Sequence, residues 1–241
     1  MTSTHPRVIG VLLLGAPAFM LVSVAIVVPA GLTLNPTDPA ATLAAVRDQA
    51  GLHLLELAFD VLGWLALTAA GLALAGSTPR AALPGGLLAA AGLAGLLHDA
   101  GNLAVTQLAT TTDPASPAAA HALLLTAKWG VNLAGLLWAA ALAAAAAVLD
   151  LPRPLRLAGA AAALSGLAAV TLPWTTGTAA PAPTLEQAGY ALQLPVLAWY
   201  ALVGLRQLRL GEPRHGVRPE HAHRPCPAPP PGESSVERAV R

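Results

Sequence analysis

The sequence has little charge, few aromatic residues and almost no cysteine. Charged residues make up 10% of its 241 residues, whereas a soluble globular domain carries roughly 25%. The single cysteine, Cys226, excludes an internal disulfide framework and a cysteine-based zinc site. A net charge of +1 gives no electrostatic reason to expect a nucleic-acid partner. The composition is therefore not that of a soluble domain.

Long apolar runs take the place of the missing charge. Hydrophobic residues make up 55% of the chain, and a membrane helix needs about 20 mostly apolar residues. The first run is too long for the core of a signal peptide, so we expect it to be retained as a span. The sequence predicts an all-α, polytopic bundle of six transmembrane helices that contacts the lipid bilayer. The predicted spans are residues 8–30, 52–75, 83–108, 119–149, 155–174 and 185–208.

The arginines predict how this bundle is oriented. Most arginines fall in the connections on one side of the bundle, whereas the connections on the other side carry only Arg47, together with acidic residues. Because positively charged connections remain in the cytoplasm, we expect both termini there. The abundance of Ala, Gly, Pro and Arg favours a bacterial source, and hence the bacterial cytoplasmic membrane as the location. The arginines of the predicted cytoplasmic side are Arg7, Arg80, Arg153, Arg156, Arg206, Arg209, Arg214 and Arg218.

Turn-forming residues and a change in composition divide the chain. Residues 35–51 form the largest predicted external connection, and 42–49 within it have the pattern of a short surface helix. Toward the C-terminus Pro, His, Glu, Ser and Arg come to dominate. We therefore expect one transmembrane domain over residues 1–210 and a disordered cytoplasmic tail over 211–241.

Titratable side chains lie inside the predicted spans. Lys128, the only lysine, falls within the fourth span. Charge near the middle of a bilayer is costly, so a residue of this kind is by default a functional-site hypothesis. Helical periodicity gives spans two, three, four and six one polar stripe each. The stripes consist of His53, Glu56 and Asp60; His98, Asp99 and Asn102; His121, Lys128 and Asn132; and Glu186, Tyr190 and Gln193.

The depths of these residues suggest that three of the stripes meet. At the helical rise per residue, Asp60, Asp99 and Lys128 all fall roughly 12–13 Å below the outer surface. In a dry pocket Lys128 would pair with Asp60 or Asp99, and a second carboxyl would be protonated or bound to a positive group. We therefore expect a titratable site in the outer half of the bundle, suited to a proton, a cation or a small molecule. Its candidate binding or proton-relay residues are Lys128, Asp60, Asp99, Glu56, Asn102 and Asn132.

The chemistry of this site stays open among three classes. The first is proton-coupled transport or the binding of a small molecule such as a lipid or another amphiphile. The second is a metal-dependent membrane enzyme, in which His53, His98 and His121 with nearby carboxylates would hold Zn²⁺ or Fe²⁺. A bis-histidine haem at His98 would need a partner that lies too near the surface. The third is an ion-pair network that only holds the helices together.

The predicted metal site lacks the compact motifs of known metal centres. The sequence has no HExxH pair. His98 and Asp99 are adjacent, and adjacent residues point about 100° apart on a helix, so both would rarely bind one ion.

A short sequence at the start of the predicted fifth span resembles one found elsewhere. Residues 151–159 read Leu-Pro-Arg-Pro-Leu-Arg-Leu-Ala-Gly. They resemble the Pro-Arg-x-Leu-Gly-like motif that opens the fifth helix in a bacterial multispan integral-membrane family of unknown function. The segment 35–49 and the carboxylate of Asp60 are similar as well, so the resemblance covers residues 8–209. It implies a multispan inner-membrane protein, and it assigns no activity, cofactor or site residue.

Overall fold

The fold is all-α, as predicted. The computed structural model describes residues 4–111, 113–172 and 183–210. Six of its helices are long and apolar enough to cross a membrane. The chain is therefore a multi-pass membrane protein. The elements are α1 (Thr4–Ala30), α2 (Pro39–Asp48), α3 (Ala50–Ala75), the 3₁₀ helix η1 (Pro79–Ala81), α4 (Ala82–Ala109), α5 (Ser116–Val148), α6 (Arg153–Thr171) and α7 (Pro183–Leu210).

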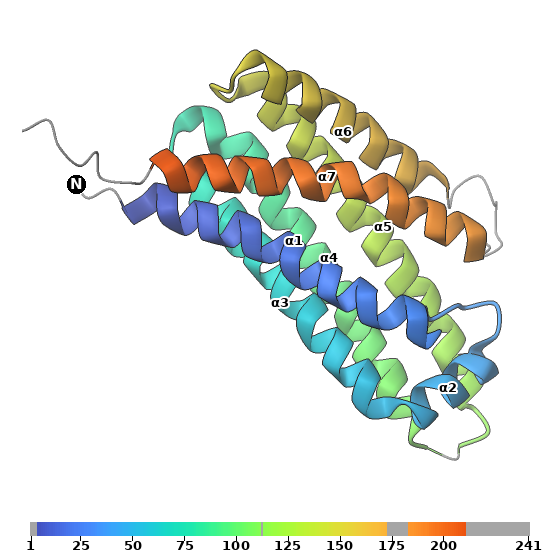
Figure 1. The fold of residues 1–241 in the computed structure, drawn as a ribbon. Coiled ribbons are helices and arrows are strands. Elements are labelled where there is room, and N and C mark those ends of the chain that lie inside the picture. Colours follow the sequence, from blue (N-terminus) through green and yellow to red (C-terminus); the bar gives the residue numbers. More distant parts are fainter. Residues whose placement is uncertain (1–3, 112, 173–182, 211–241) are drawn as a thin grey trace, which may run out of the picture. The chain divides into compact units, whose positions relative to one another are not determined.

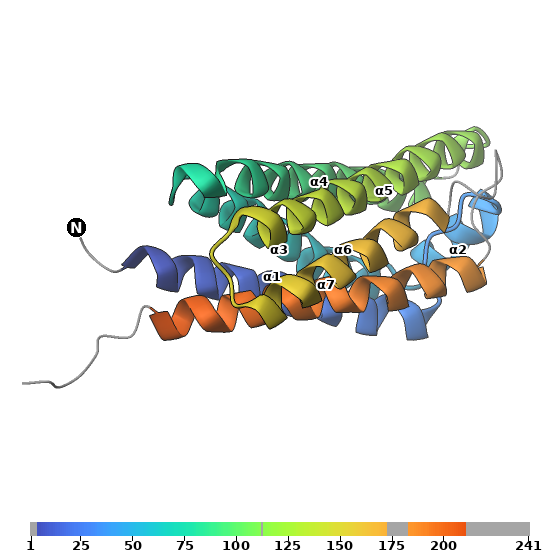
Figure 2. The same ribbon diagram turned by 90° about the horizontal axis from the view of Figure 1, so that it is seen from above.

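The six long helices are arranged as a closed series. Each packs against the next long helix along the chain, and α7 returns to pack against α1 (Figures 1 and 2). The first turn of α1 and the last turn of α7 lie at one end of this bundle, which we call the termini end. The short helix α2 lies at the other end, the α2 end. The side of the membrane that each end faces stays a prediction from the arginines.

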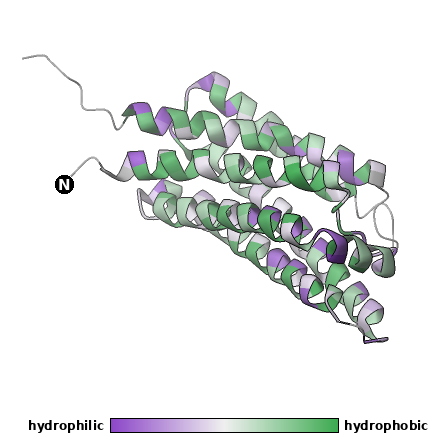
Figure 3. Cartoon of the chain, turned by 60° about the horizontal axis from the view of Figure 1, so that its bottom comes forward, coloured by the Kyte–Doolittle hydropathy of each residue, from purple (hydrophilic) through white to green (hydrophobic). Residues whose placement is uncertain are grey.

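Hydrophobic residues predominate along the long helices (Figure 3), and many large apolar side chains are exposed on them. Leu97 is 73% exposed, Leu164 69% and Leu72 63%. Hydrocarbon offers no partners for backbone N–H and C=O groups, and a helix pairs almost all of them internally. Apolar side chains on the outside of a helical bundle are therefore the surface that lipid requires.

Glycines set the distance between α3 and α4. A Cβ atom added at Gly71 would lie 2.3 Å from the backbone nitrogen of Ala89. One added at Gly95 would lie 2.0 Å from Cδ2 of Trp64. Small residues allow such close approach where lipid supplies no hydrophobic driving force for helix association. The two helices thus meet along their length, with the Trp64 ring against the α4 backbone.

Polar contacts hold helix α2 against the ends of α1 and α4. Asp38 caps it, because its Oδ1 accepts a hydrogen bond of 2.9 Å from the Ala41 nitrogen. Arg47 Nε donates to the carbonyl of Ala109 at 2.6 Å, at the last turn of α4. Gln49 Nε2 donates to the carbonyl of Ala30 at 3.2 Å, at the end of α1. The short helix predicted at residues 42–49 is confirmed, and it starts three residues earlier.

The predicted spans agree with the observed helices to within about four residues at most ends. The fifth helix ends at Thr171, and the last two residues of its predicted span, 173 and 174, lie outside the described residues. The predicted tail over 211–241 also lies outside them. The division of the chain at residue 210 therefore stays a prediction.

Candidate functional site

A cavity of about 620 Å³ opens inside the half of the bundle nearest α2. Five long helices line it, together with Leu32, Thr33 and Leu34 of the connection between α1 and α2. One wall is apolar and comes mainly from α1 and α7, with Leu21, Val24, Val28, Leu194 and Leu197 among its residues. The polar side chains that line the cavity are Ser23, Thr33, Glu56, Asp60, His98, Asn102, Lys128, Gln187, Tyr190 and Gln193.

Aromatic rings close the cavity toward the termini end. Trp64 and Trp138 both line it, and their ring centroids lie 5.8 Å apart. Tyr200 packs against Trp138 with a centroid distance of 5.8 Å, and it is 2% exposed. These rings come from α3, α5 and α7, so they fill the interior across the bundle. These rings therefore lie between the cavity and the termini end.

A buried His–Glu pair stands at the edge of the cavity. His53 is fully buried and Glu56 is 6% exposed, and His53 Nδ1 lies 3.3 Å from Glu56 Oε1. The second oxygen of Glu56 accepts a hydrogen bond of 2.8 Å from the Ser23 hydroxyl of α1. Glu56 therefore joins α1 to α3. Nothing in the sequence pattern of the first span pointed to Ser23, which is a lone hydroxyl in an apolar helix.

Asp60, His98 and Asp99 come together between α3 and α4. Each offers one ligand-type atom, and these three atoms lie within 4.8 Å of one another. Asp60 and His98 line the cavity, whereas Asp99 lies behind them and is 1% exposed. Neither Asp99 oxygen makes a hydrogen bond in the described part of the chain. Asp60 Oδ2 accepts a hydrogen bond of 3.2 Å from Trp64 Nε1.

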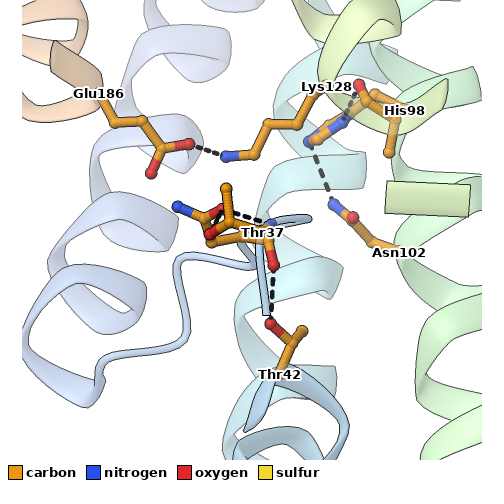
Figure 4. A network of polar contacts seen from close by, with 8 residues as sticks. Thr37, Thr42, His98, Asn102, Lys128 and Glu186 are labelled. Carbon is orange, nitrogen blue, oxygen red and sulfur yellow. Dashed lines mark hydrogen bonds and ion pairs between the residues drawn. The ribbon is translucent and has the colours of Figure 1, made fainter. Parts of the chain in front are cut away.

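Hydrogen bonds fix the orientation of the His98 ring. Its Nδ1 lies 2.8 Å from the carbonyl oxygen of Ala127, which can only accept, so Nδ1 carries the hydrogen. Its Nε2 lies 3.1 Å from Asn102 Nδ2, which donates to it. The lone pair of Nε2 therefore accepts the hydrogen bond from the Asn102 amide (Figure 4).

Lys128 pairs with Glu186 of α7 (Figure 4). The expectation that it would pair with Asp60 or Asp99 is therefore wrong. Glu186 stands in the first turn of α7, and its side chain is 10% exposed. The stripe of Glu186, Tyr190 and Gln193 is visible in the sequence, but nothing in the sequence pairs Glu186 with Lys128 of another span.

Three other predicted site residues lie outside the group formed by Asp60, His98 and Asp99. His121 Nδ1 donates to the carbonyl of Pro36 at 2.8 Å and so holds the connection before α2. Asn132 Nδ2 donates to the carbonyl of Val170 at 2.7 Å, toward α6. His53 pairs with Glu56, outside the group formed by Asp60, His98 and Asp99. Of the three histidines expected to bind a metal, the structure brings only His98 beside Asp60 and Asp99.

The electrostatic balance of the cavity is acidic. Lys128 is the only lysine or arginine among the residues that line it, and Glu186 neutralises it. Glu56, Asp60 and Asp99 then stand without a lysine or arginine within ion-pair distance, as far as residues 4–111, 113–172 and 183–210 show. Carboxyl groups without a basic partner inside a membrane protein must be protonated or meet a positive charge, so this wall favours a proton or a positively charged partner.

Comparison with known proteins gives no family for this chain. No family model matches it, and neither does any curated protein or solved structure. The resemblance at residues 151–159 therefore identifies no family, and the six long apolar helices support only a multispan membrane protein.

Proposed function

We propose that this membrane protein binds a small amphiphilic organic cation in the cavity between α1, α3, α4, α5 and α7. The observation that carries the proposal is the pairing of an apolar wall with an acidic one, where the only lysine is already neutralised by Glu186. Small-molecule sites are typically cavities of roughly 300–1,000 Å³, mostly apolar, with a few polar groups that fix orientation. A volume of about 620 Å³ lies within that range.

The two walls would act on different parts of the ligand. Apolar surface removed from water contributes about 25 cal/mol per Å², and Val24, Leu194 and Leu197 offer that surface. The carboxylates of Glu56 and Asp60 attract the positive group, and they do so strongly because the surroundings have a low dielectric constant. An anion of the same shape would face the same carboxylates and be repelled.

The surroundings of the cavity favour access from the lipid or from the α2 end. Leu21 and Leu194 line the cavity and yet are 44% and 51% exposed. Toward the termini end α1 and α7 pack closely, because a Cβ added at Gly10 would lie 2.8 Å from the carbonyl oxygen of Gly204. The arginine distribution supports an α2 end outside the cytoplasm of a bacterium, so the ligand would come from the outer leaflet or the external medium.

Proton-coupled transport and metal-dependent catalysis are separate candidate functions, and each needs more than a cavity that binds a ligand. Transport would also need a path toward the termini end, where Trp64, Trp138 and Tyr200 fill the interior. Binding needs only the cavity, and we therefore propose binding as the function.

The experiment compares two ions of the same shape and opposite charge. Tetraphenylphosphonium and tetraphenylborate are titrated into the purified protein in detergent micelles. Binding is followed by the fluorescence of the tryptophans, two of which, Trp64 and Trp138, line the cavity. After subtraction of partitioning into empty micelles, we expect the phosphonium to bind at least about tenfold more tightly, which corresponds to about 1.4 kcal/mol.

Variants locate the binding site. Glu56→Gln and Asp60→Asn should each weaken binding of the phosphonium by a factor of about three to ten, which is about 0.7–1.4 kcal/mol. Asp48→Asn, an exposed carboxylate on α2, is the control and should leave the affinity unchanged. Equal affinity for the two ions, or equal effects of all three variants, would contradict the proposal.

A further inference from the structure

We propose that Asp60, His98 and Asp99 form a binding site for one divalent transition-metal ion, of the class of Zn²⁺, Fe²⁺ and Mn²⁺, in the wall of the cavity. Adjacent residues point about 100° apart on a helix and rarely bind one ion. In this structure the ligand-type atoms of His98 and Asp99 nevertheless lie within 4.8 Å of each other and of Asp60. The inference goes beyond the binding of an organic cation: Asp60 lines the cavity and is shared by the two sites, whereas Asp99 does not line it.

The burial of Asp99 is the first observation that points to an ion. Asp99 is 1% exposed, and neither of its oxygens has a hydrogen-bond partner in the described residues. Buried polar groups are paired in the great majority of cases, and an unpaired carboxylate is especially costly. Asp60 cannot satisfy Asp99 while both groups are ionised, because two carboxylates repel each other. A cation between them would supply the missing partner of both.

The orientation of His98 is the second observation. Histidines that bind metals through one ring nitrogen usually donate the other N–H to a backbone carbonyl or a carboxylate, which fixes the tautomer. His98 donates Nδ1–H to the carbonyl of Ala127 at 2.8 Å, and so keeps the lone pair on Nε2. Asn102 Nδ2 donates a hydrogen bond to this lone pair at 3.1 Å. The Asn102 side chain would have to rotate away for an ion to bind Nε2.

Asp60 has a supporting contact of the same kind. Trp64 Nε1 donates to Asp60 Oδ2 at 3.2 Å, which orients the carboxylate and leaves Oδ1 for an ion. Carboxylates that bind metals are themselves commonly hydrogen-bonded. Two of the three side chains thus have partners that set their direction, and Asp99 is held by burial.

Distance and charge both permit an ion at this position. Ligand bonds of about 2.1 Å separate neighbouring ligand atoms by roughly 3.0–3.4 Å, so the three side chains would close by about 1–2 Å. Two carboxylates and one divalent ion sum to zero charge, which is the least costly total within a membrane. Because Asp60 and His98 line the cavity, the open coordination positions face it.

The donor set selects the class of metal. Imidazole suits Zn²⁺ and Fe²⁺, whereas carboxylates suit Mn²⁺ as well, and the described residues place no thiolate near the site. Sequence periodicity suggested His53 and His121 as further ligands, but His53 lies beside Glu56 and His121 binds the carbonyl of Pro36.

The first experiment measures metal binding alone. Purified protein is stripped with a chelator, exchanged into chelator-free buffer and titrated with Co²⁺ and Zn²⁺ by calorimetry, without any organic ligand. We expect one site per chain, weakened at least about 100-fold by Asp99→Asn or His98→Gln, since removing mere supporting contacts already costs about 10- to 100-fold. His121→Gln and Asp48→Asn serve as histidine and carboxylate controls and should bind as the unmodified protein does.

The second experiment tests direct contact at residue 99, which matters if Asp99→Asn fails to fold. Asp99→Cys is made in a Cys226→Ser background, so that residue 99 carries the only thiol. With Co²⁺ it should show a thiolate-to-cobalt charge-transfer absorption that Cys226→Ser alone lacks.

Two results would overturn the metal site. One is Co²⁺ affinity that is equal in the unmodified protein, Asp99→Asn and His98→Gln, with all three folded. The other is a Co²⁺ complex of Asp99→Cys without the charge-transfer band. Either would leave the tetraphenylphosphonium measurement untouched, so the failure of one proposal is distinct from the failure of the other.

Discussion

The charged side chains inside the bundle differ in whether they have a partner of opposite charge. Lys128 is neutralised by Glu186 across α5 and α7, with side-chain exposures of 20% and 10%. The carboxylates of Asp60 and Asp99 are left with no comparable partner. The single lysine therefore links α5 to α7 through its ion pair. The acidic residues Asp60 and Asp99 are the ones that can bind a cation.

Removing the lysine tests the first of these roles. Lys128→Met leaves the buried carboxylate of Glu186 without its counter-charge. Hydrogen bonds to charged groups contribute about 1.5–3 kcal/mol, and we expect a loss of this size in the free energy of unfolding. Adding Glu186→Gln should recover most of it, because no unpaired charge then remains. Thermal unfolding of both single variants and the double variant in detergent measures the coupling, and additive effects would contradict the pairing.

A second substitution tests the contact that supports Asp60. Trp64→Phe removes the indole N–H that bonds Asp60 Oδ2. We expect Co²⁺ affinity to fall about tenfold, as is usual for the loss of a supporting contact. Trp138→Phe is the matched control, because its ring nitrogen makes no hydrogen bond within the described residues. If both variants lowered the affinity equally, packing and not the hydrogen bond would explain the effect.

Sequence periodicity predicted the polar wall better than it predicted the partners within it. His53, Glu56 and Asp60 were assigned to one stripe because helical spacing is a local property. The ion pair of Lys128 could not be predicted in the same way, since it depends on how α5 and α7 are rotated about their axes. Ser23 carried no signal at all, because its partner Glu56 lies on another helix.

At the scale of elements, one helix pair positions the proposed metal site. Trp64 lies one turn after Asp60 on α3, and Gly95 lies one turn before Asp99 on α4. The Trp64 ring packs onto Gly95, with only 2.0 Å left for a Cβ atom. This contact sets the register of α3 against α4 and thereby brings the two carboxylates side by side.

Two glycine substitutions on α4 separate this effect from helix propensity. Gly95→Ala should destabilise the protein by about 1–3 kcal/mol through overpacking against Trp64, and it should weaken Co²⁺ binding. Gly86→Ala is the control, because a Cβ there meets nothing within 4 Å. It should be neutral or stabilising by up to about 1 kcal/mol, since alanine favours the helix. Thermal unfolding and Co²⁺ titration check both, and a loss of stability in Gly86→Ala would argue against the packing explanation.

Hydropathy predicted the helices themselves within a few residues, because membrane helices are local apolar runs. It said nothing of which helices would be neighbours. The closure of α7 onto α1 depends on Gly10 and Gly204, whose close approach becomes visible only in three dimensions.

At the scale of the whole molecule, the orientation in the membrane decides which compartment the cavity serves. The arginines of the termini end predict that this end faces the cytoplasm. Arg80 in η1 and Arg153 at the start of α6 belong to connections at this end. Arg206 of α7 donates to the carbonyl of Asp150, just before α6, at 3.4 Å. These arginines all belong to the same end of the bundle, which is why the positive-inside rule predicts that this end stays in the cytoplasm.

Cysteine labelling in intact cells tests this orientation. In a Cys226→Ser background, Ala115→Cys adds a thiol to the connection between α4 and α5, and Ser77→Cys adds one between α3 and η1; both positions are exposed. A membrane-impermeant maleimide should label residue 115 in intact cells and residue 77 only after the membrane is permeabilised. The opposite pattern would place the α2 end in the cytoplasm. The cavity would then draw its organic cation from the inner leaflet, although the carboxylates that attract the cation would be unchanged, because they are set by the packing of α3 against α4.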